Sequence, residues 1–152
     1  MQIPMWDKVK ETVLYLKSKG HRVDGIGWQG HLMNNQGLKQ FVENLDEELK
    51  KLSDLIDWAH SNNLEFHITE LDYYNDGENN ILNSVQKQAD VYQKLMNLSQ
   101  EKSKNGLVTV NFWSMGERKS SRGKKGHYMS IYDNDTIPTK TYEVVKKFIN
   151  FN

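Results

Sequence analysis

The sequence has no cysteine and no excess of either charge, since twenty basic side chains balance twenty acidic ones among 152 residues. Without cysteine the chain has neither a disulfide framework nor a thiolate zinc site, which is compatible with a reducing or an oxidising compartment. Because the charges balance, no overall field favours nucleic acid or an anionic membrane. We therefore expect neither a nucleic-acid nor a membrane partner.

Long hydrophobic segments are also missing. Residues 1–20 carry charges throughout, so they form neither the apolar region of a signal peptide nor a spanning helix, and no later window is apolar enough to span. The 37% of hydrophobic residues is enough for one core. No linker or low-complexity tract divides the sequence, so we expect a single domain over residues 1–152.

Apolar periodicity predicts alternating helices and strands. Helices are predicted over residues 5–19, 45–59, 82–96 and 140–151, and strands over 22–28, 64–71 and 107–113. Gly20 is in the position of a helix stop, and Asn44 followed by Glu47 predicts a capping box. The order αβαβαβα predicts parallel strands joined by right-handed crossovers, either in an open doubly wound sheet or in part of a closed barrel.

The strand ends are the places to expect a site, because both architectures bind ligands at the carboxyl ends of their strands. Polar residues follow the apolar runs there, in WQGH (28–31), TELDY (69–73) and WSMGER (113–118). Strand alternation projects Glu70 and Asp72 to one side and Leu71 to the other. Gln29 and His31 also share a strand face, so an amide and an imidazole can orient a nucleophilic carboxylate.

Other chemistries have less support. His31, Glu70 and Asp72 could gather around a metal ion, but no HExxH pair or other ligand spacing indicates one. The glycines of GIGWQG (25–30) lack the GxGxxG order that opens a phosphate-binding helix, so we expect no metal and no nucleotide cofactor. The basic stretch RKSSRGKKGH (118–127) fits a phosphate contact or a solvated loop, and the loop is favoured because no aromatic is interleaved.

Two motifs carry a family resemblance. VDGIGWQGHL (23–32) and ITELD (68–72) resemble, in this order, the sixth and seventh strands of glycoside hydrolase family 10 xylanases. The resemblance extends through Trp113 to IYD (131–133) and PTKTY (138–142), which look like that family's last crossover into its final helix. It implies an α/β fold that is the C-terminal half of a (β/α)8 TIM barrel, with about three parallel strands and four helices.

The resemblance also implies an activity. The family cleaves β-1,4-xylan with retention of configuration, so the implied substrate is xylan or a related β-1,4-linked polysaccharide. By this resemblance Glu70 is the catalytic nucleophile, His31 orients it, and Gln29 contacts the sugar. Further candidates are Trp113 and Glu117 for substrate binding and Asp72 and Thr69 for support, although Trp113 could equally fill core volume. An extracellular location is implied by the family, while residues 1–20 hold no export signal.

The sequence departs from the family pattern in several places. The family's acid/base glutamate lies in an Asn-Glu motif on the fourth strand, and this chain has no Asn-Glu pair in such a position. The family's Trp-Gly is Trp113-Ser114 here, its acidic residue is Glu117 instead of Asp, and a sugar-stacking Trp corresponds to Ser121. Residues 33–43 form a longer segment than usual, interpreted as a lid or an insertion.

Three strands cannot close an eight-stranded barrel, so the sheet is expected to be incomplete. Its exposed edges and apolar faces predict a partner, either the missing N-terminal half-barrel or a second copy in a homo-oligomer. A non-catalytic half-barrel that binds carbohydrate or serves in assembly is therefore the alternative to an enzyme.

Overall fold

The computed structural model describes residues 3–33, 36–75, 81–119 and 127–149. The elements follow in the order α1 (Ile3–Ser18), β1 (Gly25–Trp28), β2 (His31–Leu32), α2 (Gln36–Glu43), α3 (Leu45–Ser61), β3 (Glu65–Asn75), the 3₁₀ helix η1 (Ile81–Asn83), α4 (Val85–Lys102), β4 (Val108–Phe112), β5 (Arg118–Lys119), β6 (His127–Met129) and α5 (Lys140–Lys146). The predicted alternation of helices with parallel strands is confirmed, and short elements are added to it.

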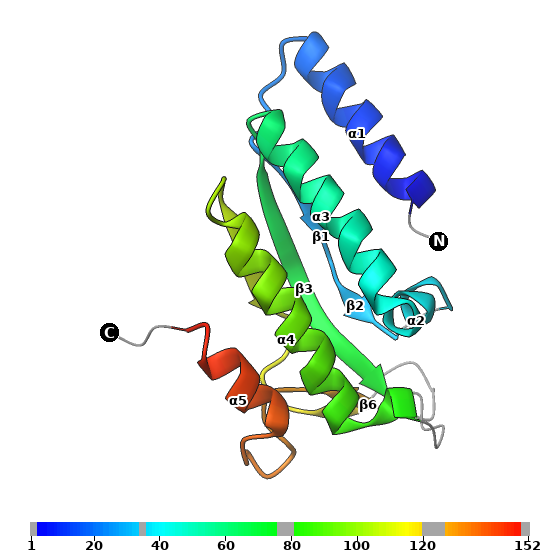
Figure 1. Cartoon of the computed structure of the whole chain (residues 1–152), viewed down its shortest axis with the longest axis vertical. Coiled ribbons are helices and arrows are strands. Elements are labelled where there is room, and N and C mark those ends of the chain that lie inside the picture. Colours follow the sequence, from blue (N-terminus) through cyan, green and yellow to red (C-terminus); the bar gives the residue numbers. More distant parts are fainter. Residues whose placement is uncertain (1–2, 34–35, 76–80, 120–126, 150–152) are drawn as a thin grey trace.

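The long strand β3 is the centre of the sheet (Figure 1). Because Ile26 of β1 and Val108 of β4 both pair with Phe66, these two parallel strands lie on opposite edges of β3. The short β2 pairs parallel with the later part of β3, and the antiparallel pair β5–β6 joins the end of β3 through β6. Within the described residues no strand pairs with the outer edge of β1 or β4, so the sheet is not closed.

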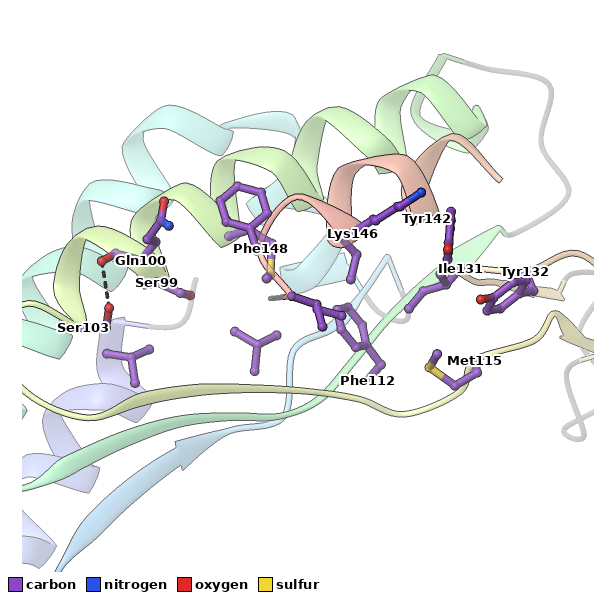
Figure 2. A pocket seen from close by; sticks show the side chains of 15 residues that line it. Ser99, Gln100, Ser103, Phe112, Met115, Ile131, Tyr132, Tyr142, Lys146 and Phe148 are labelled. Carbon is purple, nitrogen blue, oxygen red and sulfur yellow. Dashed lines mark hydrogen bonds between the residues drawn. The ribbon is translucent and has the colours of Figure 1, made fainter. Parts of the chain in front are cut away.

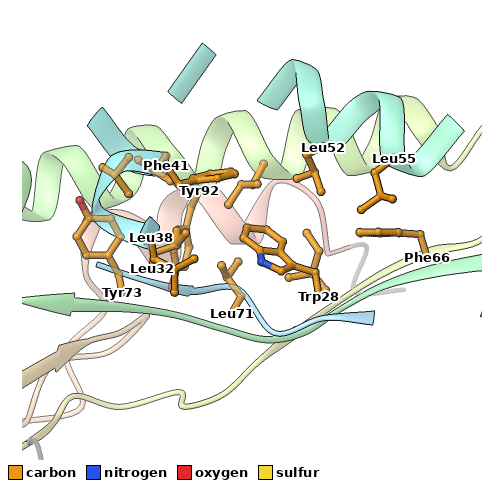
Figure 3. Close-up of a cluster of buried hydrophobic side chains, with 14 of the residues drawn as sticks. Trp28, Leu32, Leu38, Phe41, Leu52, Leu55, Phe66, Leu71, Tyr73 and Tyr92 are labelled. Atoms are coloured by element: carbon orange, nitrogen blue, oxygen red, sulfur yellow. The ribbon is translucent and has the colours of Figure 1, made fainter. Parts of the chain in front are cut away.

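The two crossover helices α3 and α4 lie on the same face of the sheet (Figure 1). On that face Trp28, Phe66 and Leu71 point from the strands toward Leu52 and Leu55 of α3, and all five side chains are buried (Figure 3). Alternate residues of each strand face the other way, and the register shift of β3 between Ile68 and Leu71 allows both Phe66 and Leu71 to face the helices. One face of the sheet therefore forms the hydrophobic core, while the opposite face is left for other contacts.

The helix ends show one prediction confirmed and one wrong. Gly20, with a φ of +80°, follows the end of α1 as predicted. The capping box at Asn44 does not form, because α2 ends just before this residue and its side-chain amide donates to the Gln40 carbonyl at 3.1 Å. The clear cap is at α4, where the Ser84 hydroxyl accepts from the Lys87 backbone N–H at 3.0 Å.

Two segments differ from the sequence-based expectation. Residues 36–43, expected to be part of a lid or an insertion, form α2, whose Leu38, Phe41 and Val42 are buried in the core. The last helix, predicted to reach residue 151, ends at Lys146. Residues 120–126 of the basic stretch, which include Ser121, lie outside the described residues.

Candidate active site

The site is built where β1 gives way to β2 beside the middle of β3. Between these strands the chain turns at Gly30, which has a φ of +76° and lies so close to β3 that an added Cβ would be 3.2 Å from Ile68 Cγ2. The Glu70 backbone N–H donates to the Gln29 carbonyl at 2.9 Å. The pairing of β3 with β4 shifts register between Ile68 and Leu71. The turn at Gly30 and the register shift in β3 together bring side chains of two strands close to one another.

Glu70, His31 and Asp72 form a chain of contacts. Glu70 Oε2 lies 3.0 Å from His31 Nε2, and Asp72 Oδ1 lies 3.0 Å from His31 Nδ1. The second Glu70 oxygen, Oε1, accepts from the Gln29 side-chain amide at 3.3 Å. Leu71, between the two acids, is buried in the core. The structure therefore brings together Gln29, His31, Glu70 and Asp72.

The number of protons shared by Glu70, His31 and Asp72 follows from the hydrogen-bond donors and acceptors of these three side chains. A neutral imidazole carries one N–H and can donate to only one carboxylate, whereas His31 faces a carboxylate oxygen with each ring nitrogen. An imidazolium satisfies both oxygens, and so does a neutral ring next to a protonated Glu70. The arrangement can therefore hold one proton between Glu70 and His31 while Asp72 fixes the far side of the ring.

Burial increases along this series of contacts, from Glu70 through His31 to Asp72. The side chains of Glu70 and His31 are 24% and 19% exposed, whereas that of Asp72 is 2% exposed. Burial raises the pKa of the Tyr92 phenol, and the negative charge of Asp72 raises it further. Tyr92 therefore stays protonated in the core near this carboxylate. Among the described residues, the side chains of Glu70 and His31 are therefore partly accessible to a ligand, whereas that of Asp72 is not.

Trp113 and Thr69 flank this cluster. The Trp113 ring meets the His31 ring edge-on, with centroids 5.9 Å apart at 86°, and the residue is 53% exposed. That exposure argues against a core-filling role and leaves an aromatic surface beside His31. The Thr69 hydroxyl donates to the Trp28 carbonyl at 3.3 Å, which ties β3 to the end of β1.

Glu117 lies in a different set of contacts. Its Oε2 accepts from the Asn134 side-chain amide at 3.0 Å, and its Oε1 lies 3.9 Å from His127 Nε2. Sequence reasoning missed Asn134 and His127 as neighbours of Glu117. The three residues come from different parts of the chain, brought together by the β5–β6 pairing and the loop before α5, so no local spacing could have predicted their contact.

The residues that the structure describes contain no group of three or more His, Asp or Glu side chains arranged to hold a metal ion. None of their helices combines the length and the apolar character needed to cross a membrane.

Sequence and structure comparisons define the family. Residues 4–148 match the model of glycosyl hydrolase family 10, and the chain belongs to this family. It is 33% identical over 114 residues to endo-1,4-beta-xylanase A of Thermoanaerobacterium saccharolyticum, covering 74% of this chain and 8% of that protein. It is 26% identical over 157 residues to a beta-1,4-xylanase of Dictyoglomus thermophilum, covering 93% of this chain and 41% of that protein.

Solved structures show the same fold. The GH10 xylanase of Thermobacillus composti matches with a TM-score of 0.71 at 21% identity, over 97% of this chain and 49% of that one. Xylanase 10B of Thermotoga petrophila, solved with xylobiose, matches with a TM-score of 0.64 at 22% identity, over 92% of this chain and 40% of that one. The fold is thus part of a family 10 TIM barrel, and this chain spans less than half of these related chains.

Proposed function

We propose that this chain supplies the nucleophile half of a retaining glycoside hydrolase site that cleaves β-1,4-linked xylan, with Glu70 as the nucleophile. The observation that carries the proposal is the contact of both Glu70 oxygens, one with the Gln29 amide and the other with the His31 imidazole. These contacts hold a partly exposed carboxylate in one orientation. Membership of glycosyl hydrolase family 10 and similarity to xylanases support the substrate class.

The chemistry assigned to Glu70 is nucleophilic. An ionised Glu70 oxygen attacks the anomeric carbon while the bond from that carbon to the leaving oxygen breaks, which gives a covalent glycosyl-enzyme. His31 donates to Glu70 before attack, and Asp72 keeps the ring in place through its other nitrogen. Water then cleaves the ester and releases Glu70. Trp113 is proposed to stack on the sugar, Gln29 to contact it, and Glu117 to contribute to substrate binding further from the nucleophile.

A retaining site needs a second carboxyl group, about 5 Å from the first, that protonates the leaving oxygen and then activates water. Asp72 does not fit this role, because its side chain is 2% exposed and already contacts His31. In the proposal the acid/base comes from outside this chain. General acid–base catalysis contributes about 10² to 10⁴ in rate, so this chain alone should hydrolyse xylan very slowly.

A substrate that needs no acid tests Glu70 directly. In an aryl β-xylobioside with a dinitrophenyl group, the dinitrophenolate departs as a stable anion. Attack by Glu70 should therefore release one equivalent of dinitrophenolate and leave a glycosyl ester. Intact-mass measurement and peptide mapping should locate that ester on Glu70 in the wild type. Glu70→Gln should give neither burst nor adduct, whereas Glu101→Gln, an exposed glutamate on α4, should behave as the wild type. Equal release by wild type and Glu70→Gln, without an adduct, would refute the assignment.

A second candidate function is a non-catalytic half-barrel for carbohydrate binding or assembly. Within the part of the chain that the structure describes, the outer edges of β1 and β4 have no strand partner, which favours this function because such edges readily accept further strands. This module should bind xylo-oligosaccharides beside Trp113, with fluorescence quenching as readout, yet form no adduct with the aryl xylobioside. Binding without an adduct would support the module, and an adduct on Glu70 would exclude it.

A further inference from the structure

The turn between α4 and β4 contains Asn105-Gly106, the one Asn-Gly pair of the sequence. Asn105 is exposed, and its side chain forms no hydrogen bond with any residue that the structure describes. The Gly106 backbone N–H also donates to none of the described residues, whereas the Asn105 backbone N–H donates to the Lys102 carbonyl at 3.0 Å. A side-chain amide and a backbone nitrogen, each without a partner among the described residues, are thus adjacent in this turn.

An Asn-Gly pair of this kind can react with itself. The Gly106 nitrogen loses its proton to a base in solution and bonds to Asn105 Cγ, while the bond from Cγ to Nδ2 breaks and ammonia leaves. Water then opens the resulting succinimide ring. Opening between Cγ and the nitrogen gives aspartate, and opening between the carbonyl carbon and the nitrogen gives isoaspartate, in which the main chain runs through Cβ and Cγ. Glycine favours the attack because it has no Cβ to hinder its nitrogen.

Asn63 offers a comparison in the same region. With Asn105 it lines a cavity of about 370 Å³ at the amino ends of β1, β3 and β4, and it is exposed as well. The next residue is Leu64, which is buried and whose backbone N–H donates to the Ala59 carbonyl at 2.9 Å. Attack on Asn63 would have to break that hydrogen bond beside a branched side chain. The local structure therefore protects Asn63 and leaves Asn105 open to reaction.

We propose that Asn105 is a site of spontaneous deamidation and that its isoaspartate product weakens the start of the β3–β4 pairing. The reaction needs only water, and it releases ammonia without oxidation or reduction. The proposal does not depend on the proposed function, because the side-chain contacts of Glu70 are with Gln29 and His31.

The structure leaves little room for isoaspartate. An added Cβ on Gly106 would be 2.6 Å from His60 Cδ2, so this part of the main chain is packed against the imidazole. Isoaspartate inserts a methylene group into the main chain just before Gly106. The Leu107 carbonyl that follows accepts from the Phe66 backbone N–H at 3.0 Å, at the start of the β3–β4 pairing. The longer main chain should therefore displace this carbonyl and weaken its hydrogen bond.

Both products also add a negative charge. Asp24 and Glu65 line the same cavity, so a carboxylate at position 105 would join two others. The side chains of Asp24 and Glu65 are 61% and 49% exposed, and repulsion between exposed charges is screened by salt. The change in charge should therefore disturb the fold less than the change in the main chain does.

Ageing of the full chain tests the site. The wild type is incubated in mildly alkaline and in mildly acidic buffer, digested, and mapped by mass spectrometry with fragmentation that distinguishes isoaspartate from aspartate. Position 105 should gain both products, faster in the alkaline buffer because the attacking nitrogen must lose a proton. Asn63, measured in the same digest, should convert at least about tenfold more slowly, since a backbone hydrogen bond must first break. An intact Asn105, or equal conversion of Asn63, would overturn the proposed site.

Two variants separate the main-chain change from the charge. Asn105→Gln keeps the amide but would have to close a larger ring, and it should stay unmodified over the same period. Freshly prepared Asn105→Asp carries the charge without the extra main-chain atom, and its urea midpoint should stay close to that of the wild type. The isoaspartate form, separated by chromatography, should unfold at lower urea and lose amide protection at Phe66. An isoaspartate form with the stability and the Phe66 protection of Asn105→Asp would overturn the effect on β4.

Discussion

At the scale of single residues, the candidate site depends on His31 having two carboxylate neighbours. Asp72 is buried and Glu70 is partly exposed, so the imidazole links an interior charge to one that a ligand can reach. A buried carboxylate is costly unless it is hydrogen-bonded. The contacts of His31 with Glu70 and Asp72 therefore also stabilise this part of the fold.

Replacing His31 should therefore affect stability as well as chemistry. In His31→Ala, Asp72 loses one hydrogen-bond partner in a site that water reaches poorly, and we expect the free energy of unfolding to fall by about 1–3 kcal/mol. Urea denaturation measures this change. His21→Ala alters an exposed histidine and should stay within about 0.5 kcal/mol of the wild type. Equal effects of the two substitutions would mean that the His31–Asp72 contact contributes little to folding.

At the scale of elements, the sequence predicts what is local and misses what depends on distant partners. The periodic stripes of α3 and α4 and the apolar run of β4 predict these elements to within a few residues at most ends. The capping box at Asn44 was wrong because α2 occupies the preceding residues. β5 and β6 have two and three residues and exist through pairing, so periodicity had nothing to detect.

The turn between β1 and β2 gives an element-scale prediction. Gly30→Ala puts a side chain at a φ of +76° and within 3.2 Å of Ile68, whereas Gly20→Ala meets the same backbone restriction at +80° with open space around it. The left-handed conformation costs about 1–2 kcal/mol for a residue with a Cβ. Gly20→Ala should show that cost alone, and Gly30→Ala more, with the difference measured by urea denaturation. Equal losses would show that β3 yields to the added methyl group.

At the scale of the whole molecule, the family motifs predicted the architecture but not its surfaces. VDGIGWQGHL and ITELD indicated a partial barrel, and strand alternation predicted that Glu70 and Asp72 share a side. The contact of both acids with one imidazole depends on the turn at Gly30, which spacing alone does not specify. The predicted length of the last helix was wrong, because α5 ends at Lys146 and the residues Phe148 and Ile149 beyond it line a cavity together with β4 (Figure 2). Apolar periodicity alone does not place the end of this helix.

The open sheet also predicts where the molecule is least stable. β3 is hydrogen-bonded on both sides, whereas β1 and β4 each have one edge without a strand partner among the described residues. Amide protons whose hydrogen bonds lie in the centre of a cooperative unit exchange only with its full opening, and those at open edges exchange through small local fluctuations. Hydrogen exchange of the isolated chain, measured residue by residue, should therefore find the strongest protection in β3. Amides that point outward from β1 and β4 should exchange orders of magnitude faster, and protection there should rise only when a strand-bearing partner is added. Equally strong protection of both outer edges in the chain alone would mean that self-association already covers them, and the open sheet would then not be the state in solution.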